Sequence, residues 1–170
     1  MQKIKTNNLC LKFITFFIVL NLVTLASAAT MQTSFLVSAT VQNSCITSTF
    51  TADPLNFGNY TGNLAQSFNT IHFQCTVGDN LSFAINPGNS GSFPGTRYMV
   101  NGSYQLNYNV YTSNSYATIW GDGTGGTSTQ TVVATGVPNQ TLTAYGQVPA
   151  GQTTVPAGAY NDTLTVTVTY

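Results

Sequence analysis

The chain has 170 residues, of which 42% are hydrophobic and only 5% are charged. Beyond residue 28 its single lysine or arginine is Arg97, against four aspartates, which leaves that part with a net charge of −3. One cation cannot neutralise a phosphate backbone or an anionic lipid surface. The composition therefore excludes nucleic-acid binding and membrane attachment through a basic patch.

Residues 1–28 have the pattern of a secretory signal peptide. Three lysines precede the apolar run 13–25, and the small residues Ala26, Ser27 and Ala28 follow it. A membrane anchor is the alternative, but the run is shorter than the roughly 20 mostly apolar residues that span a bilayer. We therefore expect cleavage after Ala28 and export of the remainder.

Cys45 and Cys75 are the only cysteines beyond the signal peptide. Two cysteines in an exported chain predict a disulfide, and only one pairing exists. It would close a loop of about 30 residues, which stabilises a domain by about 3–4 kcal/mol in the chain-entropy model. Two buried free thiols are the alternative. A metal site is disfavoured because His72 is the only histidine.

Short runs of alternating apolar and polar residues dominate the chain after residue 30. Successive side chains of a strand point to opposite faces, so each run predicts a strand with one face in a core. Turn residues separate the runs, and Asn101-Gly102 predicts a hairpin between 97–100 and 104–112. The pattern indicates one all-β sandwich domain of about seven strands. The runs are 35–41, 71–75, 81–85, 106–110, 142–148 and 164–170.

No arrangement of residues predicts catalysis, and we expect no catalytic residue, metal ion or cofactor. The chain contains no glutamate for carboxylate pairs and no G-x-S-x-G elbow. The glycine-rich loop around Asp122 faintly resembles a calcium-binding repeat, but it occurs once, so a hairpin loop is favoured. Trp120 and Tyr145 are interpreted as packing residues, and Arg97 as a partner for Asp162 or another aspartate.

Taken in order, several motifs together resemble a known family. They are the 35–41 run before Cys45, Leu55-Asn56-Phe57-Gly58, Cys75, Arg97-x-Met99, Leu106-x-Tyr108-x-Val110-Tyr111, Trp120-Gly121-Asp122-Gly123, Tyr145-Gly146-x-Val148-Pro149, Pro156-x-Gly158-x-Tyr160-x-Asp162-Thr163 and Val166-Thr167-Val168-Thr169-Tyr170. This series resembles the spore coat protein U domain, the fold shared by Csu-type subunits of archaic chaperone–usher pili. The resemblance covers essentially the whole exported part.

The resemblance implies an incomplete immunoglobulin-like β-sandwich that lacks its last strand. A periplasmic chaperone would first fill the resulting groove. At an outer-membrane usher, the N-terminal segment of the next subunit would replace it. Segment 29–42 is then the donor strand and 43–170 the pilin domain; alternatively, 35–41 is simply the first strand of its own sandwich. The implied donor inserts are Phe35, Val37, Ala39 and Val41, and the C-terminal strand at the groove and chaperone carries Leu164, Val166, Val168 and the anchor Tyr170.

These expectations combine into a functional prediction. The chain would be a non-enzymatic subunit of an adhesive, biofilm-promoting pilus on the cell surface, polymerising with copies of itself or with other pilin subunits. A structural protein of a spore or cyst coat is one alternative. The other is a self-complete sandwich that binds carbohydrate, which exposed aromatic residues beside the 121–126 loop would support.

Overall fold

The computed structural model describes residues 29–93 and 95–170, so the predicted signal peptide lies outside the described residues. The chain divides into two units, one ending at Ala39 and the other formed by residues 40–170. Within 29–39 no helix or strand is formed. Among the residues described, no helix meets the length and hydropathy that a membrane span requires.

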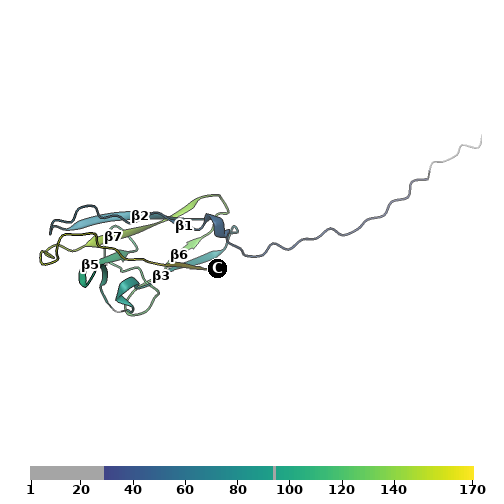
Figure 1. Cartoon of the computed structure of the whole chain (residues 1–170). Coiled ribbons are helices and arrows are strands. Elements are labelled where there is room, and N and C mark those ends of the chain that lie inside the picture. The colour runs from purple at the N-terminus through teal and green to yellow at the C-terminus, as the bar shows by residue number, and fades with distance from the viewer. Residues whose placement is uncertain (1–28, 94) are drawn as a thin grey trace, which may run out of the picture. The chain divides into compact units, whose positions relative to one another are not determined.

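Residues 40–170 form an all-β sandwich of two antiparallel sheets, as predicted (Figure 1). The larger sheet has the order β1-β2-β7-β5-β4 and the smaller one the order β6-β3-β8. Eight strands are found in the described residues, against the seven or so expected. They are β1 (Thr51–Ala52), β2 (Ala65–Phe73), β3 (Asn80–Ile85), β4 (Arg97–Asn101), β5 (Tyr104–Tyr111), β6 (Gln130–Val133), β7 (Gln140–Val148) and β8 (Val166–Thr169), with short 3-10 turns η2 (Thr47–Thr49) and η3 (Gly88–Ser90).

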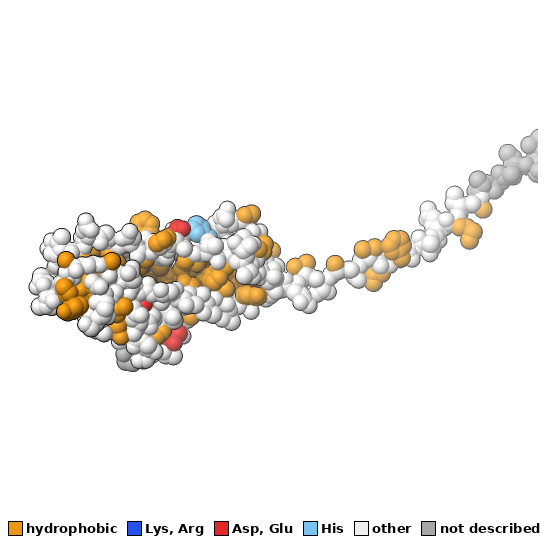
Figure 2. All heavy atoms as spheres, in the orientation of Figure 1, with side chains coloured by type: hydrophobic (Ala, Val, Ile, Leu, Met, Phe, Trp, Pro, Cys, Tyr) orange, Lys and Arg blue, Asp and Glu red, His pale blue; other side chains and the backbone are white. Residues whose placement is uncertain are grey.

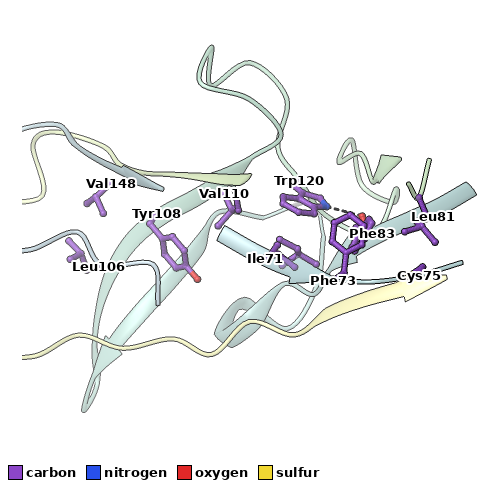
Figure 3. Close-up of a cluster of buried hydrophobic side chains, with 13 residues drawn as sticks. Ile71, Phe73, Cys75, Leu81, Phe83, Leu106, Tyr108, Val110, Trp120 and Val148 are labelled. Carbon is purple, nitrogen blue, oxygen red and sulfur yellow. Dashed lines mark hydrogen bonds between the residues drawn. The ribbon is translucent and has the colours of Figure 1, made fainter. Parts of the chain in front are cut away.

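The core lies between the sheets and follows the alternation of the sequence. Leu81, Phe83 and Ile85 of β3 are at most 2% exposed. Phe83 packs against Phe73 of β2 with ring centroids 4.9 Å apart. Trp120 is fully buried and donates its indole N–H to the Phe83 carbonyl at 2.8 Å (Figure 3), which satisfies the one polar atom of its ring. Its predicted packing role is confirmed.

The predicted disulfide is confirmed. Cys45 and Cys75 are bonded, and the two residues also form an antiparallel bridge. Backbone N–H groups of Ile46 and Thr76 donate across this bridge to Gln74 and Ser44 at 2.9 Å each. The beginning of the folded domain is therefore tied to the chain just after β2.

The predicted hairpin is also present, but its two-residue turn is Gly102-Ser103 and not Asn101-Gly102, because Asn101 still belongs to β4. β4 and β5 pair in register from Arg97 opposite Tyr108 to Asn101 opposite Tyr104. Gly102 has a φ of +59°, which a glycine adopts without steric cost in a two-residue hairpin turn.

The expectation that Arg97 pairs with an aspartate was wrong. Its side chain is fully buried and no carboxylate of the described residues lies within ion-pair distance. Instead the guanidinium donates to the carbonyls of Asn86 (2.9 and 3.1 Å) and Trp120 (2.8 Å), and it stacks 5.0 Å from the Phe93 ring. Burial lowers the pKa of Arg97, but an arginine starts so high that it stays charged.

Candidate functional site

Two sheet edges are left without a neighbouring strand on the same side of the sandwich. β8 pairs with β3 on one side, and no described strand pairs with its other edge. β1 is the corresponding edge of the larger sheet and pairs only with β2. An unpaired edge presents a row of free N–H and C=O groups that can accept another strand.

A groove runs between these two edges. Segment 52–57, which begins in β1, forms one wall, and segment 160–166, which leads into β8, forms the other. The floor consists of core residues, among them Ile71, Val110 and Ala144. This part of the groove has a volume of about 330 Å³. Figure 2 shows apolar side chains (orange) along the hollow in this face of the molecule.

The groove continues toward the loops that join the strands at its far end. There it lies between segments 54–62 and 152–161, with a further volume of about 910 Å³. Both parts share Leu55 and Phe57. These side chains lie over Gly146 of β7, where a Cβ would meet each of them at 2.7 Å, so the glycine makes room for them. The two cavities therefore adjoin along the sandwich, and their lining combines apolar core residues with polar groups of the loops.

A polar clamp fixes the wall that leads into β8. The Asp162 carboxylate accepts hydrogen bonds from the Asn89 backbone N–H (3.0 Å) and the Tyr108 hydroxyl (2.7 Å). Burial, together with the bond to Asp162, raises the pKa of Tyr108, which keeps its hydroxyl a donor. Asn161 bridges to Val100 of β4 through two backbone bonds of 2.9 and 3.0 Å. The groove wall is thus held by β4 and η3 independently of anything that fills the groove.

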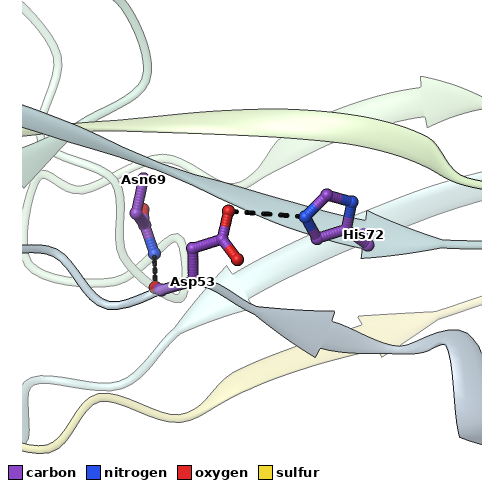
Figure 4. A network of polar contacts seen from close by, with 3 residues as sticks. All are labelled: Asp53, Asn69 and His72. Carbon is purple, nitrogen blue, oxygen red and sulfur yellow. Dashed lines mark hydrogen bonds and ion pairs between the residues drawn. The ribbon is translucent and has the colours of Figure 1, made fainter.

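The opposite wall carries a small polar cluster (Figure 4). Asp53 follows β1, and its carboxylate lies 3.4 Å from His72 Nε2 on β2. The Asn69 amide donates to the Asp53 carbonyl at 2.8 Å, which holds the wall against β2. His72 is one-third exposed, in agreement with its predicted solvent-facing position.

The predicted C-terminal residues line or border this groove to different degrees. Leu164 and Val166 line it, and with Val168 they are partly buried against the core. The apolar residues that alternate along the neighbouring strand β3 are fully buried, whereas those of β8 are only partly buried. This difference is expected for a strand that has a neighbour on one edge only. Tyr170 is 54% exposed and does not belong to the core cluster.

The predicted donor inserts are among the most exposed apolar residues described. Phe35, Val37 and Val41 are 80–85% exposed, and Ala39 is exposed as well. Although the alternation of 35–41 is that of a strand, no strand is assigned there. Alternation alone cannot hold an extended segment, because a strand needs a partner for its backbone hydrogen bonds.

The loop around Asp122 is closed by its own contacts. The Asp122 carboxylate accepts from the Thr124 N–H (2.9 Å) and hydroxyl (2.7 Å), which lowers the pKa of Asp122. No group of three or more metal-ligating side chains is found among residues 29–170 that are described. Asp122 therefore has a structural role within the hairpin loop, where it accepts hydrogen bonds from Thr124.

Sequence reasoning found the β8 wall of the groove but not its opposite wall. Segment 52–62 has no alternation that would predict a wall, and only Leu55 and Phe57 stood out, as part of a motif. The clamp residue Asp162 likewise appeared only within a motif. The one sequence feature that could have indicated this wall is the apolar pair Leu55 and Phe57, which lies between Asp53-Pro54 and Gly58.

Comparison with known proteins identifies related folds. The family model of the Spore Coat Protein U domain matches residues 31–167. A chain in the crystal structure of the CsuC-CsuE chaperone-tip adhesion subunit pre-assembly complex, from archaic chaperone-usher Csu pili of Acinetobacter baumannii, matches with a TM-score of 0.54 and 26% identity. That match covers 77% of this chain but only 40% of the solved one. No curated protein matches the sequence.

Proposed function

Because the chain belongs to the Spore Coat Protein U domain family, we propose that it is an exported structural subunit of a chaperone–usher pilus. It assembles by accepting a strand from a neighbouring subunit into its groove and by giving its own segment 29–42 to another. The family is structural rather than enzymatic. The assembled fibre lies on the cell surface, where it supports adhesion and biofilm formation.

The observation that carries this proposal is the groove between β1 and β8. A strand inserted there would pair its backbone with an unpaired edge, while alternate side chains pack on the apolar floor of the groove, which includes Ile71, Val110 and Ala144. Segment 35–41 has the complementary pattern, with four apolar residues on one face: Phe35, Val37, Ala39 and Val41. One chain therefore carries both an unpaired sheet edge beside a groove and a segment with the alternation of a strand that forms no strand of its own.

The energy available from this exchange is large relative to the stability of a domain. Burying Phe35, Val37 and Val41, each now 80–85% exposed, contributes about 1.5–3 kcal/mol per side chain, or roughly 5–9 kcal/mol before ordering costs. A typical domain has a net stability of about 5–15 kcal/mol. A subunit with an empty groove is thus marginal, which explains why a periplasmic chaperone would have to cover the groove before the usher joins subunits. The solved relative is itself a complex of a chaperone with a pilus subunit.

Strand exchange is tested by removing and restoring the donor segment. The chain is expressed for export with and without residues 29–42, and a synthetic peptide of residues 29–44 is added to the truncated form. We expect ladders of the full-length chain in unheated detergent gels, no ladders from the truncated form, and a rise in its melting temperature on addition of the peptide. A truncated domain that is a stable monomer and ignores the peptide would refute strand exchange.

A matched pair of substitutions separates insertion from general effects on the segment. Val37→Asp places a charge in the row that enters the groove and should abolish the ladders. Ser38→Asp places the same charge on the opposite face of the inserted strand and should leave them intact. Equal loss in both variants would mean that the alternation of the segment plays no part in assembly.

A structural role in a spore or cyst coat is the second candidate function, because the matching family takes its name from a spore coat protein. The same exchange of strands would build either structure. Genes for a chaperone and an usher beside this gene would favour the pilus, and expression confined to sporulation or encystment would favour the coat.

A further inference from the structure

A row of aromatic side chains crosses the outer face of the larger sheet, away from the groove. Tyr145 of β7 lies directly opposite Phe68 of β2 on one side and opposite Tyr111 of β5 on the other. Directly paired residues share a face, and their neighbours Val110 and Ala144 point into the core. The three rings therefore lie side by side on the outer surface of three adjacent strands.

A fourth ring completes this aromatic row, which we define as Phe68, Tyr111, Tyr116 and Tyr145. Tyr116 lies in the loop after β5 and packs edge-to-face against Tyr111 (5.4 Å) and Tyr145 (6.4 Å). It has a φ of +52°, which costs conformational free energy in any residue other than glycine. The loop is closed by a backbone bond of 3.0 Å from Thr112 to Thr118. The three tyrosine rings are thus held in place before any ligand arrives.

Uncharged polar groups border the aromatic row on both sides. One step along the same face, two residues away on each strand, an in-register amide row comprises Gln66, Gln147 and Asn109. Gln66 is exposed and Gln147 is half-buried, whereas Asn109 is buried and accepts from the Arg97 backbone N–H at 3.4 Å. On the other side Thr70 lies opposite Thr143. The only lysine or arginine of the described residues is Arg97, which is fully buried. The surface thus offers stacking and hydrogen bonds but no positive charge for an anionic ligand.

The size of this surface suits a narrow ligand better than a protein. Phe68 is 65% exposed and the three tyrosines are partly covered. Such a row spans three strands spaced about 4.8 Å apart. It exposes far less than the roughly 800 Å² that each partner buries in a stable protein complex.

We propose that the aromatic row binds a neutral polysaccharide that lies across β2, β7 and β5. The electron-rich faces of the rings attract the slightly positive C–H groups of a sugar ring. The accessible amides of Gln66 and Gln147 supply donors and acceptors for the sugar hydroxyls. Bound glycans at this face leave the groove open for a strand, so the site works whether or not the chain assembles into a fibre.

Affinity electrophoresis with hydroxyethylcellulose, together with sedimentation on microcrystalline cellulose and on chitin, tests this proposal on the exported full-length chain. We expect retardation or co-sedimentation on at least one of these neutral polymers, largely insensitive to salt, and none with the acidic polymer alginate. Tyr145→Ala and Phe68→Ala should weaken binding at least tenfold. Tyr104→Ala is the control, because Tyr104 is 53% exposed at the far end of β5.

Two readouts keep binding apart from folding and from assembly. Trp120 fluorescence reports the unfolding midpoint, which Phe68→Ala should leave unchanged because the ring is already mostly exposed. Gel ladders report strand exchange and should be normal in all three variants. The proposal is overturned if the wild type binds none of the neutral polymers, if it prefers alginate, or if the ring variants bind as well as the control. If the ring variants lost self-association while glycan binding was unaffected, the aromatic row would be a contact between copies of the chain. That result would also overturn the proposal.

Discussion

The buried Arg97 gives the sharpest prediction about stability. Replacing it by methionine keeps most of the side-chain volume but removes every donor to the carbonyls of Asn86 and Trp120. Hydrogen bonds to a charged group contribute about 1.5–3 kcal/mol each. Losing the hydrogen bonds to two carbonyls should therefore lower the free energy of unfolding by about 3–6 kcal/mol. Arg97→Lys keeps the charge but lacks the planar fork that reaches both carbonyls, so it should lose an intermediate amount.

Urea-induced unfolding followed by Trp120 fluorescence measures this effect. The chain has one tryptophan, it is fully buried, and its carbonyl is one of the groups concerned. Gln105→Met is a suitable control, since Gln105 is exposed on the neighbouring strand β5. If Arg97→Met unfolded at the same urea concentration as the control, the hydrogen bonds of the guanidinium to the loop carbonyls would make no net contribution to stability.

Three further predictions concern other parts of the fold. Replacing both cysteines of the disulfide by serine should lower the free energy of unfolding by about 3–4 kcal/mol, measured by denaturant titration; an unchanged midpoint would contradict the loop-closure estimate. Gly88→Ala should destabilise the groove wall by about 1–3 kcal/mol, because Gly88 has a φ of +62° and a Cβ there would meet the Asp162 carboxylate; a normal thermal melt would refute this steric reasoning. The pKa of Asp122 is lowered by its bonds to Thr124, so the loop is stabilised above the usual aspartate pKa and loses this as the pH falls through the lower folded value. An NMR titration should show the Thr124 amide shifting below about pH 4, and Asp122→Asn should remove that shift.

Most strands could be predicted because their residues face a core on one side only. The alternation in β3, β5 and β7 corresponds to buried residues such as Phe83, Val110 and Val148 in the structure. β1 and β6 were missed: β1 has two residues, too short for a period, and β6, with the sequence Gln-Thr-Val-Val, does not alternate between apolar and polar residues. Their positions are determined by pairing with β2 and β3, which is a tertiary effect.

The aspartate partner of Arg97 could not be excluded from sequence, because opposite charges are expected to meet. In the structure, loop carbonyls surround the guanidinium. Because every residue has a backbone carbonyl, the sequence cannot indicate which of them will accept its hydrogen bonds. The aromatic row was hidden for a related reason. Phe68 and Tyr145 are far apart in sequence and become neighbours only through the register of β2 and β7.

The burial of Arg97 has a consequence outside the groove and the aromatic row. Beyond residue 12, it is the only position where a protease specific for lysine or arginine could cut. Its side chain is inaccessible in the folded domain and its backbone is paired in β4. A trypsin-like enzyme in the surroundings of the cell would therefore meet no usable site until the domain unfolds. A single cut at Arg97 would then record each unfolding event, and because both cysteines precede it, the two fragments would separate without reduction.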